Sequence, residues 1–188
     1  MRLLITMCIN LMVMGVAIAG CNNPTDSPDV PPAITIIADN TSISWMVGLN
    51  KWNGATIDHI ADFPNIMSHT TFYDLPYIKN GESITIHFDY NVPETTILTE
   101  FNLKEDGNKK YNVPGMEYVI SFLKNNTVAF IIEPNFSTAF SSFSGDYEPG
   151  NTIKGYRMVC TWGGNECEYV FIIRGDAAIT MMNDEPDN

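Results

Sequence analysis

The last two cysteines of the chain have the spacing that most directly suggests chemistry. Cys160 and Cys167 have six residues between them in the stretch CTWGGNEC. Such a pair can belong to a metal site, a redox-active dithiol or a structural disulfide. A structural zinc site needs four ligands, commonly in closer pairs, and no second Cys/His pair has the spacing to complete one. A catalytic redox pair usually lies two residues apart at the start of a helix.

A second candidate site lies in the stretch GLNKWNGATIDHIAD, residues 48–62. Trp52 has the shape to stack on a ligand, while Asp58, His59 and Asp62 have donor atoms for a ligand or a divalent ion. A lone Asp–His pair is a weak metal signal. The alternative is structural: the glycines form turns, Trp52 covers the end of the domain, and Asp58 caps a short helix. We favour this alternative and keep these four residues as candidate ligand-binding residues.

Other polar groups form no recognisable catalytic set. His87 and Asp89 share the outer face of one predicted strand, which favours a solvated surface. Ser144, Asp146 and Glu148 lie in a loop that has carboxylates for calcium but lacks the dense series of a calcium-binding loop. The chain has no GxSxG elbow and no glycine-rich phosphate loop ahead of a helix. We therefore predict no metal site and no catalytic residues.

The elements that carry these residues are predicted to be strands almost throughout. In SITIHFDY, Ile84, Ile86, Phe88 and Tyr90 alternate with polar residues, as on a half-buried strand. Comparable short segments recur between turn signals such as Asp39-Asn40, EDGN and KNNT; they include AITII, SISWMV, TTILTEFNLK, EYVISF, TVAFIIE, TIKGYRMVCTW and CEYVFIIRG. The pattern predicts an all-β, antiparallel, immunoglobulin-like β-sandwich of about eight strands, with a closed barrel as the alternative.

One short helix is predicted near ATIDHIADFPNIM, where Pro64 interrupts the pattern. In the rest of the domain, the strand signals are stronger than any helical periodicity.

The last predicted hairpin decides how the two cysteines face each other. With Gly163-Gly164 as a two-residue turn, Cys160 lies opposite Cys167, and Met158 and Trp162 share their apolar face. Opposed Cα atoms in an antiparallel pair are about 4.5–5.5 Å apart, which a disulfide accepts. A hydrogen-bonded pair of positions is not the preferred site for such a bond. We predict a structural disulfide, with a pair of free thiols as the alternative.

The amino terminus has the layout of a secretory signal. Arg2 precedes an apolar run that ends in IAGC, residues 18–21. This tetrad resembles the lipobox of bacterial lipoprotein precursors, which implies cleavage before Cys21 and a diacylglyceryl group on its thiol. Two acyl chains give lasting membrane attachment, at about 0.8 kcal/mol per buried methylene. The alternatives are plain secretion and a retained helix, although the run is shorter than an ordinary membrane span.

These signals divide the chain into four parts. Residues 1–20 are the predicted lipoprotein signal peptide, and residues 21–32 are the lipidated cysteine followed by a Pro/Asp/Ser-rich tether. Residues 33–176 are the predicted β-sandwich domain, a suitable length for one domain. Residues 177–188 form an acidic tail.

The net charge of the chain makes some classes of binding partner unfavourable. The whole chain has 10 basic and 22 acidic side chains, a net charge of −12, and loss of residues 1–20 removes Arg2 alone among them. A strongly acidic mature protein is not expected to bind nucleic acid or an anionic membrane through its surface. The expected partners are therefore the membrane through the lipid anchor, and an unidentified protein or small ligand.

Several stretches together resemble those of small, uncharacterised lipoproteins of Gram-positive bacteria with immunoglobulin-like β-sandwich ectodomains. They are the lipobox, GLNKWNGATID, YIKNGESITIHFDYNVPE and the final MVCTWGGNECEYVFII. The resemblance covers most of the mature chain, although only the lipobox is specific. It implies a cell-membrane location on the extracytoplasmic side, with the diacylglycerol on Cys21 as the only attached group, and it implies no activity because this fold hosts many functions.

Three functions are compatible with these observations. The first is a membrane-anchored extracytoplasmic binding or protein-interaction module, whose loops at one end of the sandwich make the contacts. The second is an envelope hydrolase using carboxylates near Asp58 and Asp62, or in the loop of residues 144–148. The third is an accessory subunit of an envelope complex. We favour the binding module, because the chain has no recognisable catalytic set.

Overall fold

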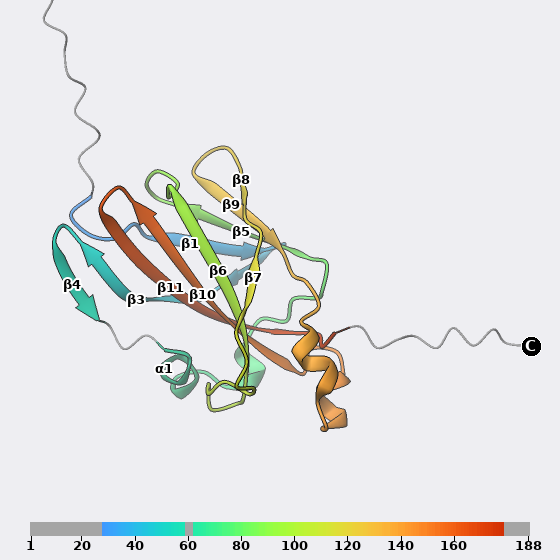
Figure 1. The fold of residues 1–188 in the computed structure, drawn as a ribbon. Coiled ribbons are helices and arrows are strands. Elements are labelled where there is room, and N and C mark those ends of the chain that lie inside the picture. The colour runs from blue at the N-terminus through green and yellow to red at the C-terminus, as the bar shows by residue number, and fades with distance from the viewer. Residues whose placement is uncertain (1–27, 59–61, 179–188) are drawn as a thin grey trace, which may run out of the picture.

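The structure, a computed structural model, describes residues 28–58 and 62–178. Within these residues, eleven strands form two antiparallel sheets that stack as a sandwich (Figure 1). The five-stranded sheet has the order β2 (Thr41–Ile43), β1 (Ile34–Ala38), β5 (Ser83–Phe88), β9 (Thr127–Ile131) and β8 (Ser121–Phe122).

The six-stranded sheet contains the long final hairpin. Its order is β4 (Ala55–Asp58), β3 (Trp45–Trp52), β11 (Asn165–Gly175), β10 (Thr152–Trp162), β6 (Thr95–Leu103) and β7 (Met116–Tyr118). Both central strands of this sheet, β10 and β11, are eleven residues long.

The connections between the sheets confirm the predicted immunoglobulin-like sandwich. Strands β5 and β9 are neighbours in one sheet, while β6 and β10 are neighbours in the other. Along the described strands, the chain therefore crosses between the sheets after β2, β4, β5, β7 and β9, as the chain repeatedly does in immunoglobulin-type sandwiches. The described strands outnumber the predicted eight because short pieces such as β2, β4 and β8 pair at the edges.

The segment EYVISF is an instance of this splitting. The sequence predicts one strand there, whereas Met116–Tyr118 pairs with β6 and Ser121–Phe122 pairs with β9 in the opposite sheet. Val119 lies between them and is 88% exposed. Alternation alone does not reveal the change of sheet, because both halves remain extended.

Side-chain alternation fills the space between the sheets. On β5, Ile84, Ile86 and Phe88 are fully buried, as the sequence predicts, and they pack against residues of β10 and β11. Tyr156 of β10 and Phe171 of β11 stack with ring centroids 5.0 Å apart and planes 13° from parallel. Burial of such large rings is the main stabilising contribution of this core.

The predicted turns are formed by residues that tolerate a left-handed backbone. Asp39 has φ +51° between β1 and β2, while Asn125 and Asn126 have φ +57° and +54° before β9. Asp and Asn adopt this conformation more readily than most residues, since their short side chains bond locally. The final hairpin turns at Gly163-Gly164, with Trp162 paired to Asn165, which confirms the predicted register.

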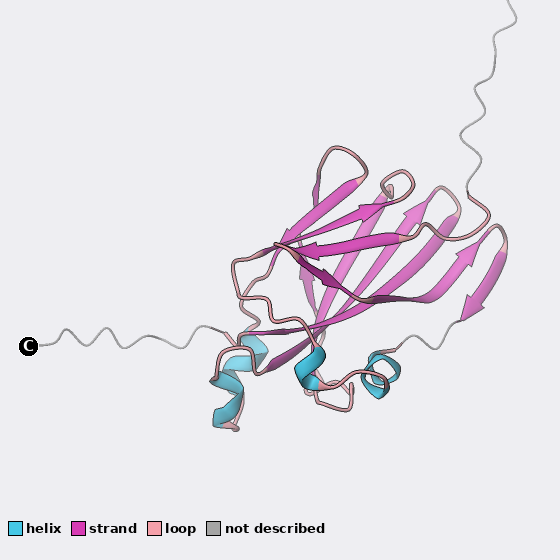
Figure 2. Ribbon diagram, turned by 180° about the vertical axis from the view of Figure 1, so that it is seen from behind, coloured by secondary structure: helices cyan, strands magenta, loops and turns pink. Residues whose placement is uncertain are grey.

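The short helices gather at one end of the sandwich (Figure 2). They are α1 (Phe63–Ser68), η1 (Phe72–Asp74), η2 (Phe136–Phe140) and η3 (Ser144–Tyr147). Pro64 lies in the first turn of α1, so it begins the helix rather than interrupting it, because a backbone N–H is not needed there. Phe63 and Met67 of α1 form a second apolar cluster with Ile153, Val170 and Ile172.

The folded domain extends slightly beyond its predicted bounds at both ends. The backbone oxygens of Pro28 and Pro32, in the predicted tether, accept hydrogen bonds from the Trp52 indole (2.7 Å) and the Tyr169 hydroxyl (2.6 Å). Ala177 and Ala178, in the predicted tail, are buried. In the described part of the chain, no helix has the length and apolar character needed to cross a membrane. The predicted signal peptide lies outside the described residues.

Close approach of α1 to the sheet generates a prediction about Gly155 of β10. A Cβ at this position would lie 2.6 Å from Leu103 Cδ1 and 2.7 Å from Phe63 Cε1. We expect Gly155→Ala to lower the free energy of unfolding by roughly 1–3 kcal/mol, because the packed cluster must move apart. Urea denaturation measures this change.

Gly164→Ala is the matched control for that measurement. A Cβ on Gly164 meets no atom within 4 Å, and its φ is not in the left-handed region. Its free energy of unfolding should stay within about 0.5 kcal/mol of the original. Equal destabilisation by both substitutions would contradict the proposed packing.

Candidate functional site

Trp52, the predicted stacking residue, lies inside the domain rather than on a binding surface. It is 4% exposed, and its ring meets that of Trp162 edge-on, with centroids 5.5 Å apart. Its indole N–H donates to Pro28, so both its face and its polar atom are occupied. This is the environment that the structural alternative describes for Trp52.

The acidic residues near Trp52 are not brought together with it. Asp58 ends the edge strand β4 and is exposed, and His59 lies outside the described residues. Asp62 caps α1 and accepts a hydrogen bond from the backbone N–H of Asn65 (2.9 Å). The prediction that Asp58 caps this helix is therefore wrong, since the cap is four residues later. Helix caps satisfy backbone N–H groups, so the Asp62 carboxylate has a structural role.

The structure also describes other polar residues that the sequence suggested as candidates. His87 and Asp89 are exposed, as predicted for an outer strand face, and the Thr127 hydroxyl lies 3.3 Å from His87 Nδ1. Asp146 in η3 is 7% exposed and binds Lys110 and the Ser141 hydroxyl, so its carboxylate is already engaged within the fold. Among residues 28–58 and 62–178, no three His, Cys, Asp or Glu side chains are grouped as a metal site requires.

A hollow of about 500 Å³ lies where the short helices meet the sandwich. Its wall is made by η1, the end of β6 with the following turn, η2, η3 and the start of β10. The lining combines aromatic rings, amides and charges of both signs: Phe72, Tyr73, Asn102, Leu103, Lys104, Glu105, Lys110, Tyr111, Thr138, Phe143, Gly145, Asp146, Asn151, Thr152 and Ile153. The volume suits a small organic ligand.

Two aromatic rings stand at the hollow without being buried. Tyr73 is 83% exposed and Phe143 is 67% exposed, although large apolar groups usually gain stability from burial. The Phe72 ring beside Tyr73 is fixed, since the Arg174 guanidinium lies 5.0 Å from its centroid. One side of the hollow is thus a supported aromatic surface that faces solvent.

The polar wall of the hollow is held by an ordered chain of hydrogen bonds. Asn102 donates through Nδ2 to the Ser137 hydroxyl (2.5 Å), and Ser137 donates to Asn135 Oδ1 (2.7 Å). Asn135 in turn donates to Glu100 Oε1 (2.8 Å). This direction leaves Asn102 Oδ1 as a buried acceptor with no partner among the described residues. An unpaired acceptor of this kind costs about 1–3 kcal/mol.

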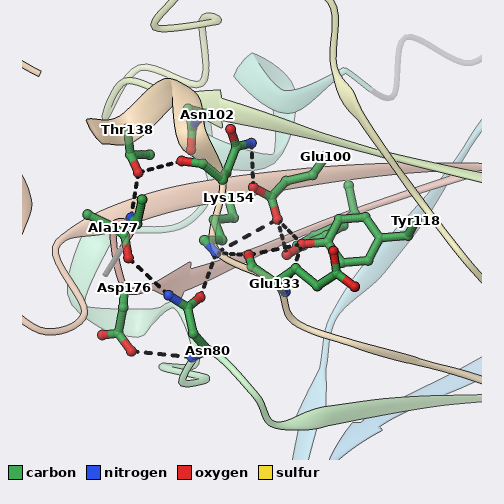
Figure 3. Close-up of polar contacts among 12 residues, drawn as sticks. Asn80, Glu100, Asn102, Tyr118, Glu133, Thr138, Lys154, Asp176 and Ala177 are labelled. Atoms are coloured by element: carbon green, nitrogen blue, oxygen red, sulfur yellow. Dashed lines mark hydrogen bonds and ion pairs between the residues drawn. The ribbon is translucent and has the colours of Figure 1, made fainter. Parts of the chain in front are cut away.

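Glu100 and Lys154 form a fully buried pair of charges between the sheets (Figure 3). Their Oε2 and Nζ atoms are 3.8 Å apart, and neither side chain is exposed to solvent. The hydroxyls of Tyr118 and Tyr156 both donate to Glu100 Oε2 at 2.6 Å. Burial raises the pKa of both hydroxyls, and the Glu100 charge adds to this, so they stay protonated donors.

The Lys154 ammonium is surrounded by oxygen atoms. Its Nζ donates to Asn80 Oδ1 (3.0 Å) and to the Glu133 backbone oxygen (3.3 Å), in addition to facing Glu100. Burial lowers the pKa of Lys154, and the negative charges of Glu100 and Asp176 counteract this change. The ammonium therefore has two hydrogen-bond acceptors and a carboxylate counter-ion, as a buried charge requires.

The sequence contains a signal for this buried pair that the strand assignments did not use. Met158, Cys160 and Trp162 share the apolar face of β10, and the same alternation places Lys154 and Tyr156 on that face. A lysine buried among apolar residues needs an anion close to its ammonium group. The register between β10 and β6 decides which anion is close. In this register Lys154 pairs with Asn102, and Tyr156 pairs with Glu100.

Cys160 and Cys167 lie opposite each other, as predicted, but both are free thiols in this structure, so the predicted disulfide is not formed. Both are fully buried. Burial raises the pKa of Cys160 to about 12 and that of Cys167 to about 11. Buried thiols with such pKa values are poor nucleophiles, because the reactive thiolate is scarce near neutral pH.

Comparisons with known proteins give no information about the function of this site. No family model and no curated protein matches this sequence. The similar solved structures include a cellulose-active polysaccharide monooxygenase from M. thermophila, with a TM-score of 0.36 and 9% sequence identity. The alignment covers 56% of this chain and 55% of that chain, so this chain spans about half its length. Similarity this low carries no argument about function.

Proposed function

We propose that the protein is a membrane-anchored, extracytoplasmic binding module whose ligand lies in the hollow beside Tyr73 and Phe143. The observation that carries this proposal is the hollow itself: about 500 Å³, with two solvent-facing rings above a hydrogen-bonded polar wall. Concave sites with apolar surfaces and a few fixed polar groups are typical of small-ligand sites. Neither Asp58 nor Asp62 lines this hollow, so the hollow does not support a hydrolase that uses these two carboxylates.

The lining favours an uncharged ligand. Lys104 and Lys110 are balanced by Glu105 and Asp146, and Lys110 and Asp146 form an ion pair with each other. An amide such as Asn151 offers both a donor and an acceptor, and the rings offer flat apolar surfaces. We therefore propose a ligand with hydroxyl or amide groups and an apolar ring face, such as a short neutral oligosaccharide.

The place of Pro28 in the fold supports presentation of the hollow away from a membrane. Pro28, the first described residue, contacts Trp52, whose ring packs on Trp162 at the tip of the final hairpin. The hollow lies at the opposite end of β10, beside Thr152 and Ile153. Eleven strand residues span roughly 35 Å. A tether from Cys21 would therefore attach to the end of the domain remote from the hollow.

We also propose that the lipid on Cys21 is the anchor and that the mature domain works beyond the cytoplasmic membrane. The support is the charge-then-apolar layout of residues 1–20 and the tetrad IAGC. In an oxidising compartment the opposed thiols of Cys160 and Cys167 would become a disulfide.

The disulfide is tested by thiol titration of the mature protein after unfolding without reductant. Unfolding is needed because the raised pKa values would make folded thiols react slowly even when free. We expect no free thiol in protein recovered from the cell envelope. Two free thiols per chain would refute the disulfide, and a sample reduced before unfolding gives the two-thiol reference.

The binding site is tested with a set of short neutral oligosaccharides and with charged ones of the same length. Binding should shift the backbone NMR signals of residues that line the hollow, and the neutral set should bind more tightly. We expect Tyr73→Ala to weaken the affinity about tenfold, because it removes the exposed ring on which a sugar would stack.

Val119→Ala is the control for this substitution. Val119 is 88% exposed but lies between β7 and β8, outside the lining of the hollow, so its loss should leave the affinity unchanged. The proposal fails if no probe perturbs the hollow, or if Tyr73→Ala binds as well as the original protein.

The anchor is tested in cells fed a fatty-acid analogue that can be labelled after lysis. The wild-type chain should take up the label and fractionate with membranes, whereas Cys21→Ser should do neither, because it lacks the acceptor thiol. A Cys8→Ser variant, changed inside the signal peptide, should be labelled normally. Equal labelling of the wild type and Cys21→Ser would refute lipidation at this residue.

A further inference from the structure

The buried charges beside Asn80 have a geometry that goes beyond ligand binding. Lys154 Nζ lies 3.0 Å from the side-chain oxygen of Asn80 and 3.8 Å from Glu100 Oε2. An amine, a carboxamide and a carboxylate thus meet in one site between the sheets (Figure 3). We propose that Lys154 and Asn80 become joined by an intramolecular amide bond, with Glu100 as the proton acceptor.

Lys154 has the environment of a nucleophilic amine. Its side chain is fully buried, and burial lowers its pKa, which favours the neutral amine that attacks a carbonyl. Its position is fixed by the Glu133 backbone oxygen at 3.3 Å. The hydrogen bond from Nζ to Asn80 Oδ1 keeps the two side chains together. A reaction between them needs no bimolecular encounter, which can accelerate even a difficult reaction by many orders of magnitude.

Asn80 is held as the acceptor of this attack. Its side-chain nitrogen donates to the Ala177 backbone oxygen (2.9 Å), and its backbone N–H donates to Asp176 Oδ2 (3.3 Å). The amide oxygen therefore faces Lys154. For the attack, the amide must rotate about Cβ–Cγ so that its flat face turns towards Nζ, and this rotation breaks the hydrogen bond to Ala177. Asn80 is only half-buried, so the leaving group has a route to solvent.

The reaction balances with the groups that are present. One ammonium proton moves to the Glu100 carboxylate, and the neutral nitrogen attacks the carbonyl carbon of Asn80. The new C–N bond forms and the bond to Asn80 Nδ2 breaks. A second proton from Nζ leaves with this nitrogen as ammonia, and the third stays on the new amide. The opposite charges of Lys154 and Glu100 disappear together, which removes the cost of keeping two ions buried.

Glu100 is oriented for this proton transfer. The Tyr118 and Tyr156 hydroxyls hold Oε2, the oxygen that faces Lys154, while Asn135 holds Oε1. Since burial raises the pKa of both hydroxyls, neither competes with Glu100 as a base. A proton acceptor must lie within reach of the proton before its basicity matters.

The bond would connect the two sheets covalently. Lys154 lies near the start of β10 in the six-stranded sheet, and Asn80 precedes β5 in the five-stranded sheet. They are 74 residues apart in the chain, so the closed loop is long. A crosslink across a long loop restricts the unfolded chain strongly, as a disulfide does.

A competing reaction has the same mass change. Asn80 precedes Gly81, and attack by the Gly81 backbone nitrogen on the Asn80 side chain would also release ammonia. In the structure this N–H donates to the Ile132 oxygen at 2.7 Å, which engages it in the fold. Loss of ammonia alone therefore does not identify the amide bond, and the linked residues must be found.

The experiment is peptide mapping of the purified full chain by mass spectrometry after tryptic digestion. We expect a branched peptide in which the segments containing Asn80 and Lys154 are joined, with the loss of one ammonia. Recovery of both segments unlinked, with Asn80 intact or converted to aspartate, would overturn the proposal. This measurement needs no variant, so it does not depend on how a substitution affects folding.

Two substitutions then test the role of Glu100. We expect Glu100→Gln to reduce the linked fraction at least tenfold in folded protein, because the amide cannot accept the proton. Glu133→Gln is the matched control: its side chain is exposed, and only its backbone oxygen contacts Lys154, so the linked fraction should be unchanged. Full linkage in folded Glu100→Gln, or equal loss in both variants, would remove Glu100 from the mechanism.

Discussion

A buried carboxylate facing a buried ammonium is the constraint on which the interior of this protein depends. Moving Glu100 and Lys154 out of water costs several kcal/mol for each ion, and their attraction recovers this only when the remaining hydrogen-bonding positions are filled. Two tyrosines, two asparagines and one backbone oxygen fill them. The core of the sandwich therefore contains hydrogen bonds, which require particular orientations, in addition to apolar packing.

That core also organises the end of the sandwich where the short helices lie. Asn135 bonds Glu100 with one side-chain atom and orders η2 with the other, because its oxygen accepts the Ser137 N–H. Ser137 then orients Asn102 in the wall of the hollow. On the other side, Asn80 connects Lys154 to Asp176 and Ala177, which follow β11. The hollow and the buried charges therefore belong to one network.

The strands could be assigned from the sequence because their signals are local. Alternation predicted the buried face of β5, and the glycine pair predicted the register that places Cys160 opposite Cys167. The local signals failed where a partner decides the outcome. Val119 looks like the middle of one strand, but it links a strand of one sheet to a strand of the other. Trp52 looks like a binding residue, but its ring packs on Trp162 and its N–H donates to Pro28.

By itself the sequence determined the fold class and the positions of most turns, since these depend on the pattern of neighbouring residues. Tertiary structure alone decided which distant groups meet. Lys154 faces Asn80 and Glu100 across long separations in the chain, and the hollow combines residues from five segments. The physical reason is that spacing fixes the side of a strand on which a residue lies, whereas pairing between strands and packing of the sheets choose its partner.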